Sequence, residues 1–306
     1  MQMSGSTPVI DLNRVIAGAQ LPALPQSAIR LLELSQNPEI GAAEFAAPIE
    51  ADPGLTGQVL KFVNSSYFGF AREISSVKLA ISLVGMRTIK NFALWSAVFS
   101  LMPNPKCGPF ELKTLWQDSL RRALFARDMA RILGAKECEE AFAAALLQDM
   151  AVPILAKEAP QVYVKLLEAR NDGRLRLSAL EQRVFGWTHA SAAGLMAQTW
   201  NLPDTFARLI ERHQDIDYWM TQASQDPLGL AVALSALLPP VVDPVWQERD
   251  LFLNCYSRID RPGKPEPEEL LTAVDTGFRE FAPVLKLSTP AKSIVEFLHE
   301  ESVVVS

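Results

Sequence analysis

Histidine and cysteine are the side chains that most readily bind a metal, transfer a proton or act as a nucleophile near neutral pH. This chain has three of each. His213 follows Phe206 and Ile210 at helical spacing, so we expect it to face inward with that apolar stripe. His189 stands at the start of a predicted helix. His299 falls near the end of the chain on a predicted helix, where we interpret it as a solvated surface residue.

The cysteines and the short motifs indicate no further chemistry. Cys107, Cys138 and Cys255 are widely separated and match no metal-binding spacing, so they are interpreted as reduced thiols of a cytosolic protein. Cys107 lies in a proline-rich loop with no histidine beside it in the sequence. The chain contains no P-loop, no G-x-G-x-x-G fingerprint and no G-x-S-x-G elbow. Known nucleotide-binding and serine-hydrolase signatures are therefore absent.

Length and composition favour a soluble globular protein. The 306 residues are 49% hydrophobic and 21% charged, and 29 basic against 35 acidic side chains give a net charge of −6. This acidic balance makes nucleic-acid binding unfavourable. The sequence begins without a secretory signal, and its apolar stretches 141–156 and 228–242 are shorter than the roughly 20 residues of a membrane span. We therefore expect a cytoplasmic protein without membrane contact.

Nearly all apolar residues repeat at helical spacing, which predicts an all-α fold. Asp52 and Pro53 favour a helix start, and Gly85 suits the end of a later helix. The segment Leu101–Phe110 holds three prolines and marks a boundary. We predict an N-terminal helical subdomain at 1–103, a second helical subdomain at 104–240 and a C-terminal helical extension at 241–306.

The predicted second subdomain contains several distinct helix signals. The apolar periodicity predicts one long helix over Leu112–Leu133 and a very apolar, buried helix over Glu137–Ala151. Ser178 and Glu181 match the S-x-x-E capping box, and Thr188 can cap the helix that opens at His189. Small residues on one side of that last helix should let a neighbouring helix approach closely; they are Ala190, Ala193, Gly194 and Ala197.

In this order, separated motifs of the chain resemble the HDOD family, the HD-related output domains of bacterial signalling proteins. The motifs are LPALPQSAIRLLEL, DPGLTGQVLKFVNSSYFG, ISSVKLAISLVGMRTIKNFAL, LWQDSLRRALFA, EEAFAAALLQDMAVPIL, FGWTHASAAGLMAQTWNLP and LIERHQ. The resemblance covers about residues 21–214. It implies an all-helical fold whose second half is similar to the HD phosphohydrolases.

The same resemblance implies that most HD metal ligands have been replaced. HD hydrolases bind one or two metal ions through a histidine, a consecutive His-Asp pair and a further aspartate. The first histidine position falls on Asp118, the pair falls on Gln148 and Asp149, and the final aspartate falls near Ala236. Only Asp149 keeps its ligand type, and a glutamine is a weak donor where a transition metal prefers imidazole.

Two interpretations of this region stay open. His189 and His213 match positions where the family often keeps a histidine, so with Asp118 and Asp149 they can form a two-His, two-carboxylate site for Mn, Fe or Zn. The alternative, which we favour, is a set of buried polar groups satisfied by hydrogen bonds without a metal. We therefore expect no cofactor.

The resemblance favours a non-catalytic signal-transduction module that binds a signalling protein or a small ligand. The alternative is a metal-dependent phosphohydrolase of the HD superfamily that acts on a nucleotide or a cyclic dinucleotide. The discriminating chemistry is the metal site, because hydrolysis by this superfamily needs a metal-activated water.

One stretch of the chain has the opposite charge to the whole. Residues 53–100 hold one acid, Glu73, and five basic residues, a net charge of +4; the basic residues are Lys61, Arg72, Lys78, Arg87 and Lys90. They can bind an anionic partner, form an ordinary solvated face, or pack against the acidic tail from Asp243 onward. We favour the solvated face, since no aromatic side chains alternate with these charges for base stacking.

Overall fold

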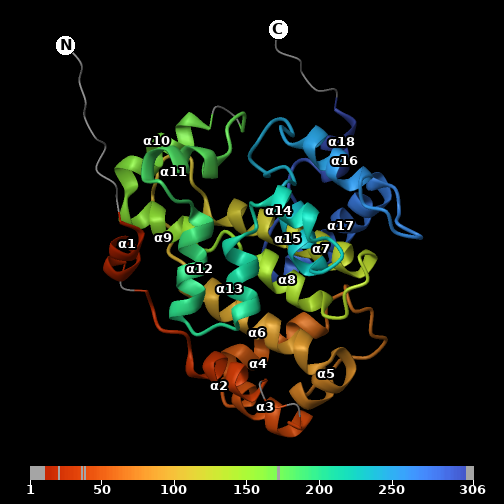
Figure 1. Ribbon diagram of the computed structural model, residues 1–306. Helices are drawn as coiled ribbons and strands as arrows, with labels where there is room; N and C mark the ends of the chain where they lie inside the picture. The colour runs from red at the N-terminus through yellow and green to blue at the C-terminus, as the bar shows by residue number, and fades with distance from the viewer. Residues whose placement is uncertain (1–10, 20, 36, 38, 171–172, 301–306) are drawn as a thin grey trace, which may run out of the picture.

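A computed structural model of the chain describes residues 11–300 except 20, 36, 38 and 171–172. Every regular element of these residues is helical, as predicted (Figure 1). No helix in the described ranges is both long and apolar enough to cross a membrane. The first helices are α1 (Leu12–Gly18), α2 (Gln26–Leu34), α3 (Ala42–Glu50), α4 (Pro53–Val63), α5 (Val77–Val84) and α6 (Met86–Leu101).

The remaining helices fall into a middle group and a C-terminal group. The middle group is α7 (Leu112–Ile132), α8 (Cys138–Leu147), α9 (Ala151–Glu158), α10 (Pro160–Ala169), α11 (Leu177–Phe185), α12 (His189–Thr199), α13 (Asp204–Glu211), α14 (Ile216–Thr221) and α15 (Pro227–Ser235). The C-terminal group is α16 (Arg249–Ser257), α17 (Pro267–Phe281), the 3-10 helix η1 (Ala282–Leu285) and α18 (Ile294–His299).

Local sequence signals explain the N-terminal helices. The Asp52 carboxylate accepts the Leu55 N–H at 3.0 Å, so the predicted cap at the start of α4 is confirmed. Gly85 joins α5 to α6 with a φ of 89°, a conformation that side chains with a Cβ rarely adopt. The turn is therefore short, and the two helices pack against each other.

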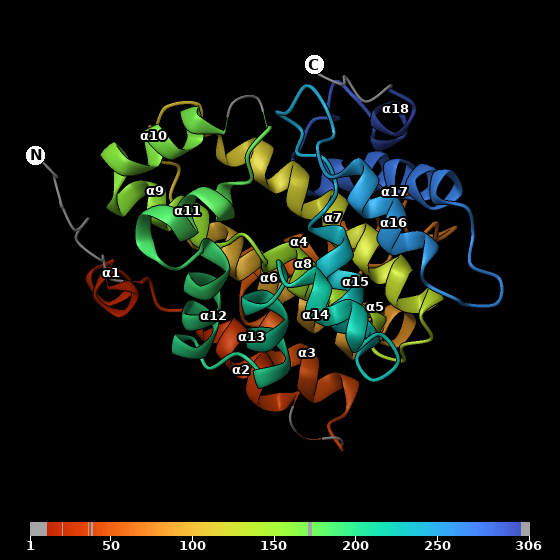
Figure 2. The same cartoon turned by 45° about the horizontal axis from the view of Figure 1, so that its top comes forward.

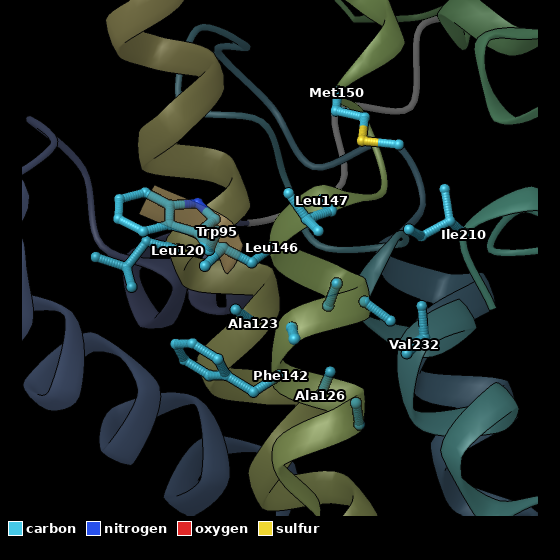
Figure 3. Packing of buried hydrophobic residues seen from close by; sticks show 14 of the residues in the cluster. Trp95, Leu120, Ala123, Ala126, Phe142, Leu146, Leu147, Met150, Ile210 and Val232 are labelled. Carbon is cyan, nitrogen blue, oxygen red and sulfur yellow. The ribbon is translucent and has the colours of Figure 1, made fainter. Parts of the chain in front are cut away.

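The core is centred on α7 and α8, which lie side by side in the middle of the molecule (Figure 3). Alanines such as Ala123 and Ala126 on α7 are fully buried and let α8 approach closely. The close approach predicted for the next helices is also found. A Cβ on Gly194 of α12 would lie 2.7 Å from the Cβ of Glu211 on α13.

The predicted buried helix over 137–151 is found, but it ends four residues early because the chain forms a turn before it continues. Helix α8 ends at Leu147, and α9 begins at Ala151. Pro153 has no N–H and cannot bond to the Asp149 carbonyl, so an uninterrupted helix would lose a hydrogen bond there. This break places Gln148 and Asp149 in a turn beside α7.

The C-terminal helices pack on the middle group, with α17 alongside α7 (Figure 2). Two polar side chains of α7 hold this region: the Gln117 amide donates to the Ser288 carbonyl at 2.6 Å, and Arg121 donates to the Lys292 carbonyl. One hydrophobic cluster includes buried residues from all three predicted parts of the chain. The predicted boundaries at 103 and 240 stay predictions.

Candidate functional site

The main candidate site is a cavity of about 680 Å³ between α7, the turn after α8, α12 and the loops that follow α10 and α15. All five positions that the family resemblance selected line this cavity: Asp118, Gln148, Asp149, His189 and His213. The predicted final position, Ala236, also lines it. The structure therefore brings together residues that are up to 118 positions apart in the sequence, since the set runs from 118 to 236.

Asp149 is the centre of a group of polar contacts inside the cavity. We call this group, Asp149 with Arg122, His189 and His213, the floor of the cavity. Its Oδ2 forms an ion pair with Arg122 of α7, and its Oδ1 lies 3.2 Å from Nε2 of His189 and 3.6 Å from Nε2 of His213. Burial opposes ionisation, but the Arg122 charge and the histidine contacts hold the pKa of Asp149 well below its usual range. Asp149 is therefore a carboxylate at neutral pH.

His189 lies between two carboxylates. Its Nδ1 is 2.7 Å from Oε2 of Glu181, and its Nε2 faces Asp149. Burial alone would lower the pKa of His189, but the charges of Glu181 and Asp149 raise it to about 10. This raised pKa favours the imidazolium form of the ring at neutral pH, and Nε2 also lies 2.7 Å from the amide nitrogen of Gln214.

Glu181 has a different role from the one its sequence context predicted. It is fully buried and accepts the His189 N–H at 2.8 Å, so it caps α12 from α11. It also accepts the Tyr163 hydroxyl. The predicted capping box with Ser178 is wrong, because α11 begins at Leu177 and its N-cap makes no side-chain bond. Thr188 occupies the N-cap position of α12 as predicted, but its side chain makes no capping hydrogen bond, and Glu181 takes that function.

His213 lies just after α13 and is buried, as its apolar stripe predicted. Its Nδ1 is 2.7 Å from the Ile210 carbonyl, so this nitrogen carries the proton and donates. Burial lowers the pKa of His213, and the ring is neutral at pH 7. Its Nε2 therefore presents a lone pair to the floor.

Gln148 occupies the position of the missing histidine and is fully buried. Its Oε1 lies 3.5 Å from the Ser235 hydroxyl, at the limit of a hydrogen bond. Its Nε2 has no hydrogen-bond partner among the described residues. A buried amide N–H without a partner is costly, so this group is a donor available to a molecule in the cavity.

Asp118 lies on the cavity wall next to the loop after α15. Its Oδ1 accepts the Val241 N–H at 2.7 Å. Burial raises the pKa of Asp118 to about 6, although Arg122 and this hydrogen bond act in the opposite direction. Its predicted role as a fourth ligand is not supported by position, because the convergent group described next does not include it.

Three residues in the described part of the chain converge as a possible metal group. Asp149, His189 and His213 each offer one atom, and these atoms lie within 4.8 Å of one another. Both histidines use Nδ1 for a hydrogen bond and direct Nε2 to the common point, which is the usual arrangement of metal-binding histidines. The donor geometry alone therefore permits a divalent ion.

The charges at the floor do not fit such an ion as they stand. The guanidinium of Arg122 already neutralises Asp149, and the protonated ring of His189 has no lone pair to give. Gln148 provides no imidazole. A metal would have to bind Oδ1 of a carboxylate that Arg122 already neutralises through Oδ2, and it would have to remove the proton from His189.

Sequence reasoning missed the arginines that line the cavity and the partner of His189. Arg122 follows Asp118 by one helical turn, and this i, i+4 spacing was the signal that could have placed both on the same face. Arg170 and Arg176 come from the loop after α10, where no local pattern indicates a site. Glu181 was visible only as an apparent capping residue.

The structure also divides the predicted basic surface. Lys61, Arg72 and Lys78 are exposed. Lys90 is buried, and its Nζ lies 3.3 Å from Glu140 of α8. Arg87 lies 3.7 Å from the same carboxylate but is itself exposed, so the structure removes only Lys90 from the predicted surface.

Comparisons with known proteins point to one family. The sequence model of the HDOD domain matches residues 21–216. A crystal structure of an HDOD domain protein of unknown function from Geobacter sulfurreducens is 21% identical, with a TM-score of 0.71 over 90% of this chain and 99% of that one. A "Putative metal-dependent phosphohydrolase" from Shewanella amazonensis SB2B is 17% identical, with a TM-score of 0.62 over 89% and 95%. At these identities the likeness shows the fold alone.

A curated relative is longer than this chain. An uncharacterized protein of Treponema pallidum (strain Nichols) is 24% identical over 199 residues, which are 65% of this chain and 38% of that protein. The similarity therefore concerns a part of that relative.

Proposed function

Because the chain belongs to the HDOD family, we propose that it is a regulatory module that binds a small ligand or a protein without catalysing a reaction. The observation that carries this proposal is the contact between Arg122 and Asp149 at the cavity floor. The guanidinium neutralises this carboxylate through Oδ2 and so weakens the attraction of a metal ion to Oδ1, the oxygen that faces the two histidines. Phosphoester hydrolysis of the HD type needs a metal-activated water, so a weak metal site favours a non-catalytic function.

Metal analysis combined with an activity assay tests the proposal. We expect purified protein incubated with Mn²⁺, Fe²⁺ or Zn²⁺ and then desalted to retain far less than one ion per chain. We also expect no metal-dependent cleavage of bis(p-nitrophenyl) phosphate. Stoichiometric metal together with cleavage that disappears in both Asp149→Ala and the near-isosteric Asp149→Asn would overturn the proposal.

The second candidate function is a metal-dependent phosphohydrolase acting on a nucleotide or a cyclic dinucleotide. The observation in its favour is the convergence of Asp149, His189 and His213. It requires an ion to bind Oδ1 of Asp149 while the guanidinium of Arg122 holds Oδ2. A double variant, Arg122→Ala with Gln148→His, separates the two candidates: under the first proposal it gains metal that the wild type lacks, and under the second it gains little.

We further propose that the module acts in a bacterial cytoplasm with a signalling protein as its partner. The exposed side chains of Lys61, Arg72 and Lys78 support a partner with an acidic surface. Nucleic acid is disfavoured by the net charge of −6.

A further inference from the structure

Two loops that line the cavity contact each other, and we call this region the mouth of the cavity. Arg170 Nη2 lies 2.6 Å from Asp243 Oδ2, and Arg176 Nε lies 3.0 Å from Glu248 Oε1. The Asp243 side chain also packs against Gly173, since a Cβ on Gly173 would lie 2.4 Å from the Asp243 carboxylate. We call residues 240–248 the strap, because they lie across the mouth and lead directly into α16.

The arginines at the mouth have unused capacity for an anion. Arg170 contacts Asp243 through Nη2, whereas its buried Nε has no hydrogen-bond partner among the described residues. Burial lowers the pKa of Arg176, and the nearby charge of Arg122 acts in the same direction. Guanidinium groups bind oxyanions best through two parallel N–H bonds. The free Nε and the crowding of positive charge therefore favour a ligand with several anionic oxygens.

The unpartnered amide of Gln148 adds a donor deeper in the same cavity. Apolar side chains, including Leu167, Leu177 and Leu238, form much of the remaining lining. The cavity volume of about 680 Å³ lies in the range of small-ligand sites. Anionic oxygens at the mouth and an apolar wall together fit a phosphate-bearing small molecule.

The strap also contacts the parts of the molecule that hold the C-terminal helices. Val241 of the strap donates to Asp118 of α7, and Lys292 Nζ donates to the Pro244 carbonyl of the strap at 3.0 Å. On the same two turns of α7, Gln117 and Arg121 hold the segment before α18. Movement of the strap therefore acts on the C-terminal region in two ways. It acts directly through the bond between Lys292 and Pro244, and it acts through α7, which contacts both the strap and the segment before α18.

We propose that the cavity mouth binds a phosphate-bearing small molecule through Arg170 and Arg176, in exchange for Asp243 and Glu248, and that this exchange releases the strap and loosens the C-terminal helices. The proposal rests on the proposed regulatory function and identifies its ligand class and its output. No covalent step is involved. The ligand favours the released state because it binds arginines that the closed mouth occupies.

Exchange is most feasible at the contact between Arg176 and Glu248, which joins partly buried groups, whereas Asp243 at the other contact is buried. The side chains of Arg176 and Glu248 are 31% and 18% exposed. Burial raises the pKa of Glu248 despite the nearby arginines, so its ionised form is poorly stabilised there. Ion pairs of this kind contribute little net stability, whereas a phosphate offers two or more charge-assisted bonds.

Hydrogen exchange measured by mass spectrometry on the full chain tests the proposal, with inorganic pyrophosphate as the probe and EDTA present throughout. In the wild type, pyrophosphate should raise exchange about fivefold in peptides covering 240–248 and 286–299, and not in α2–α5. Arg170→Gln with Arg176→Gln should show this faster exchange without ligand and no further response. Arg208→Gln, which breaks an exposed ion pair with Asp226 on another face, is the matched control.

Each outcome decides a part of the proposal. An unresponsive wild type, or slower exchange in the strap with pyrophosphate, overturns strap release by an oxyanion. Faster exchange in 240–248 without a change in 286–299 overturns the coupling to the C-terminal helices. The charge-swapped variant, Arg176→Glu combined with Glu248→Arg, should exchange in the strap as slowly as the wild type without ligand, because it keeps the ion pair. Faster exchange in this variant overturns the role of the pair. Metal-dependent cleavage of pyrophosphate by the wild type would instead contradict the proposed non-catalytic function.

Discussion

The floor and the mouth of the cavity use the same kind of contact, an arginine against a carboxylate, in different surroundings. At the floor, the side chains of Arg122 and Asp149 are 12% and 7% exposed, and Asp149 also faces two histidines. At the mouth, the side chains of Arg176 and Glu248 are 31% and 18% exposed, although Asp243 in the second contact is only 6% exposed. Removing one member of a buried pair leaves a charge without compensation, whereas water can solvate the charge that is left in a more exposed pair. The floor is therefore fixed, and the Arg176–Glu248 contact is the one best able to exchange partners.

Of the substitutions at the floor and the mouth, the removal of Arg122 should change the free energy of unfolding most. Arg122→Ala leaves Asp149 buried without its ion pair, so we expect the free energy of unfolding to fall by about 3–5 kcal/mol. Urea denaturation measures this loss. Arg131→Ala, at an exposed arginine of the same helix, is the control and should change stability by less than about 0.5 kcal/mol.

The same variant gives a second test of how the floor is neutralised. If Arg122 substitutes for a cation, Mn²⁺ or Zn²⁺ should raise the melting temperature of Arg122→Ala and leave the wild type unchanged. An equal rise in both proteins would show that Arg122 does not block the site.

Two Glu–His contacts allow the next prediction. Glu181 and His189 are buried, whereas Glu268 and His299 are exposed and 3.1 Å apart; the predicted surface position of His299 is thus confirmed. We expect Glu181→Gln to destabilise the protein by about 1–3 kcal/mol, because it removes a charged acceptor from the cap of α12. Glu268→Gln should change stability by less than about 0.5 kcal/mol. Equal losses would contradict the difference in burial.

The pH dependence of the Glu181 contribution follows from the pKa of His189. That pKa rises from an ordinary value near 6.5 to about 10 in the folded state. A group with a raised folded pKa stabilises the protein fully below its unfolded pKa, and this contribution is lost as the pH rises through the folded value. The stability difference between wild type and Glu181→Gln should therefore be largest below pH 6.5 and shrink toward pH 10. Chemical denaturation at several pH values measures it.

The fold was largely predictable from the sequence because helical periodicity and caps are local. The HDOD resemblance over residues 21–214 is confirmed, and the Asp52 cap and the inward position of His213 are where the sequence placed them. Each of these signals lies within a few residues of the feature it predicts.

The charges of the site were less predictable because they depend on partners far apart in the chain. Arg122 meets Asp149 across 27 positions, and Arg170 meets Asp243 across 73. Glu181 matched a local capping pattern and instead caps the next helix. No local pattern shows that an arginine contacts the carboxylate of the possible metal group.

A substitution at Gly173 tests how closely the loop at the mouth packs against the strap without changing a charge. Gly173→Ala places a Cβ against Asp243 at a φ of 87°, so we expect a loss of about 1–3 kcal/mol. Gly263 has a similar φ of 74° with open space around it, and Gly263→Ala is therefore the control for conformation alone. A loss in Gly173→Ala no larger than in Gly263→Ala would mean that the strap is not tightly packed against this loop. Thermal or urea unfolding of both variants provides the comparison.

The smallest effect on overall stability should come from Arg176. Arg176→Gln removes a partly exposed ion pair, and a double-mutant cycle with Glu248→Gln should give a coupling energy of about 0.2–1 kcal/mol. The corresponding cycle of Arg122→Ala with Asp149→Asn should give a clearly larger value. Similar coupling at both sites would remove the distinction between floor and mouth. A small value at the mouth also fits local opening of the strap, because a segment can open while the core that sets global stability stays folded.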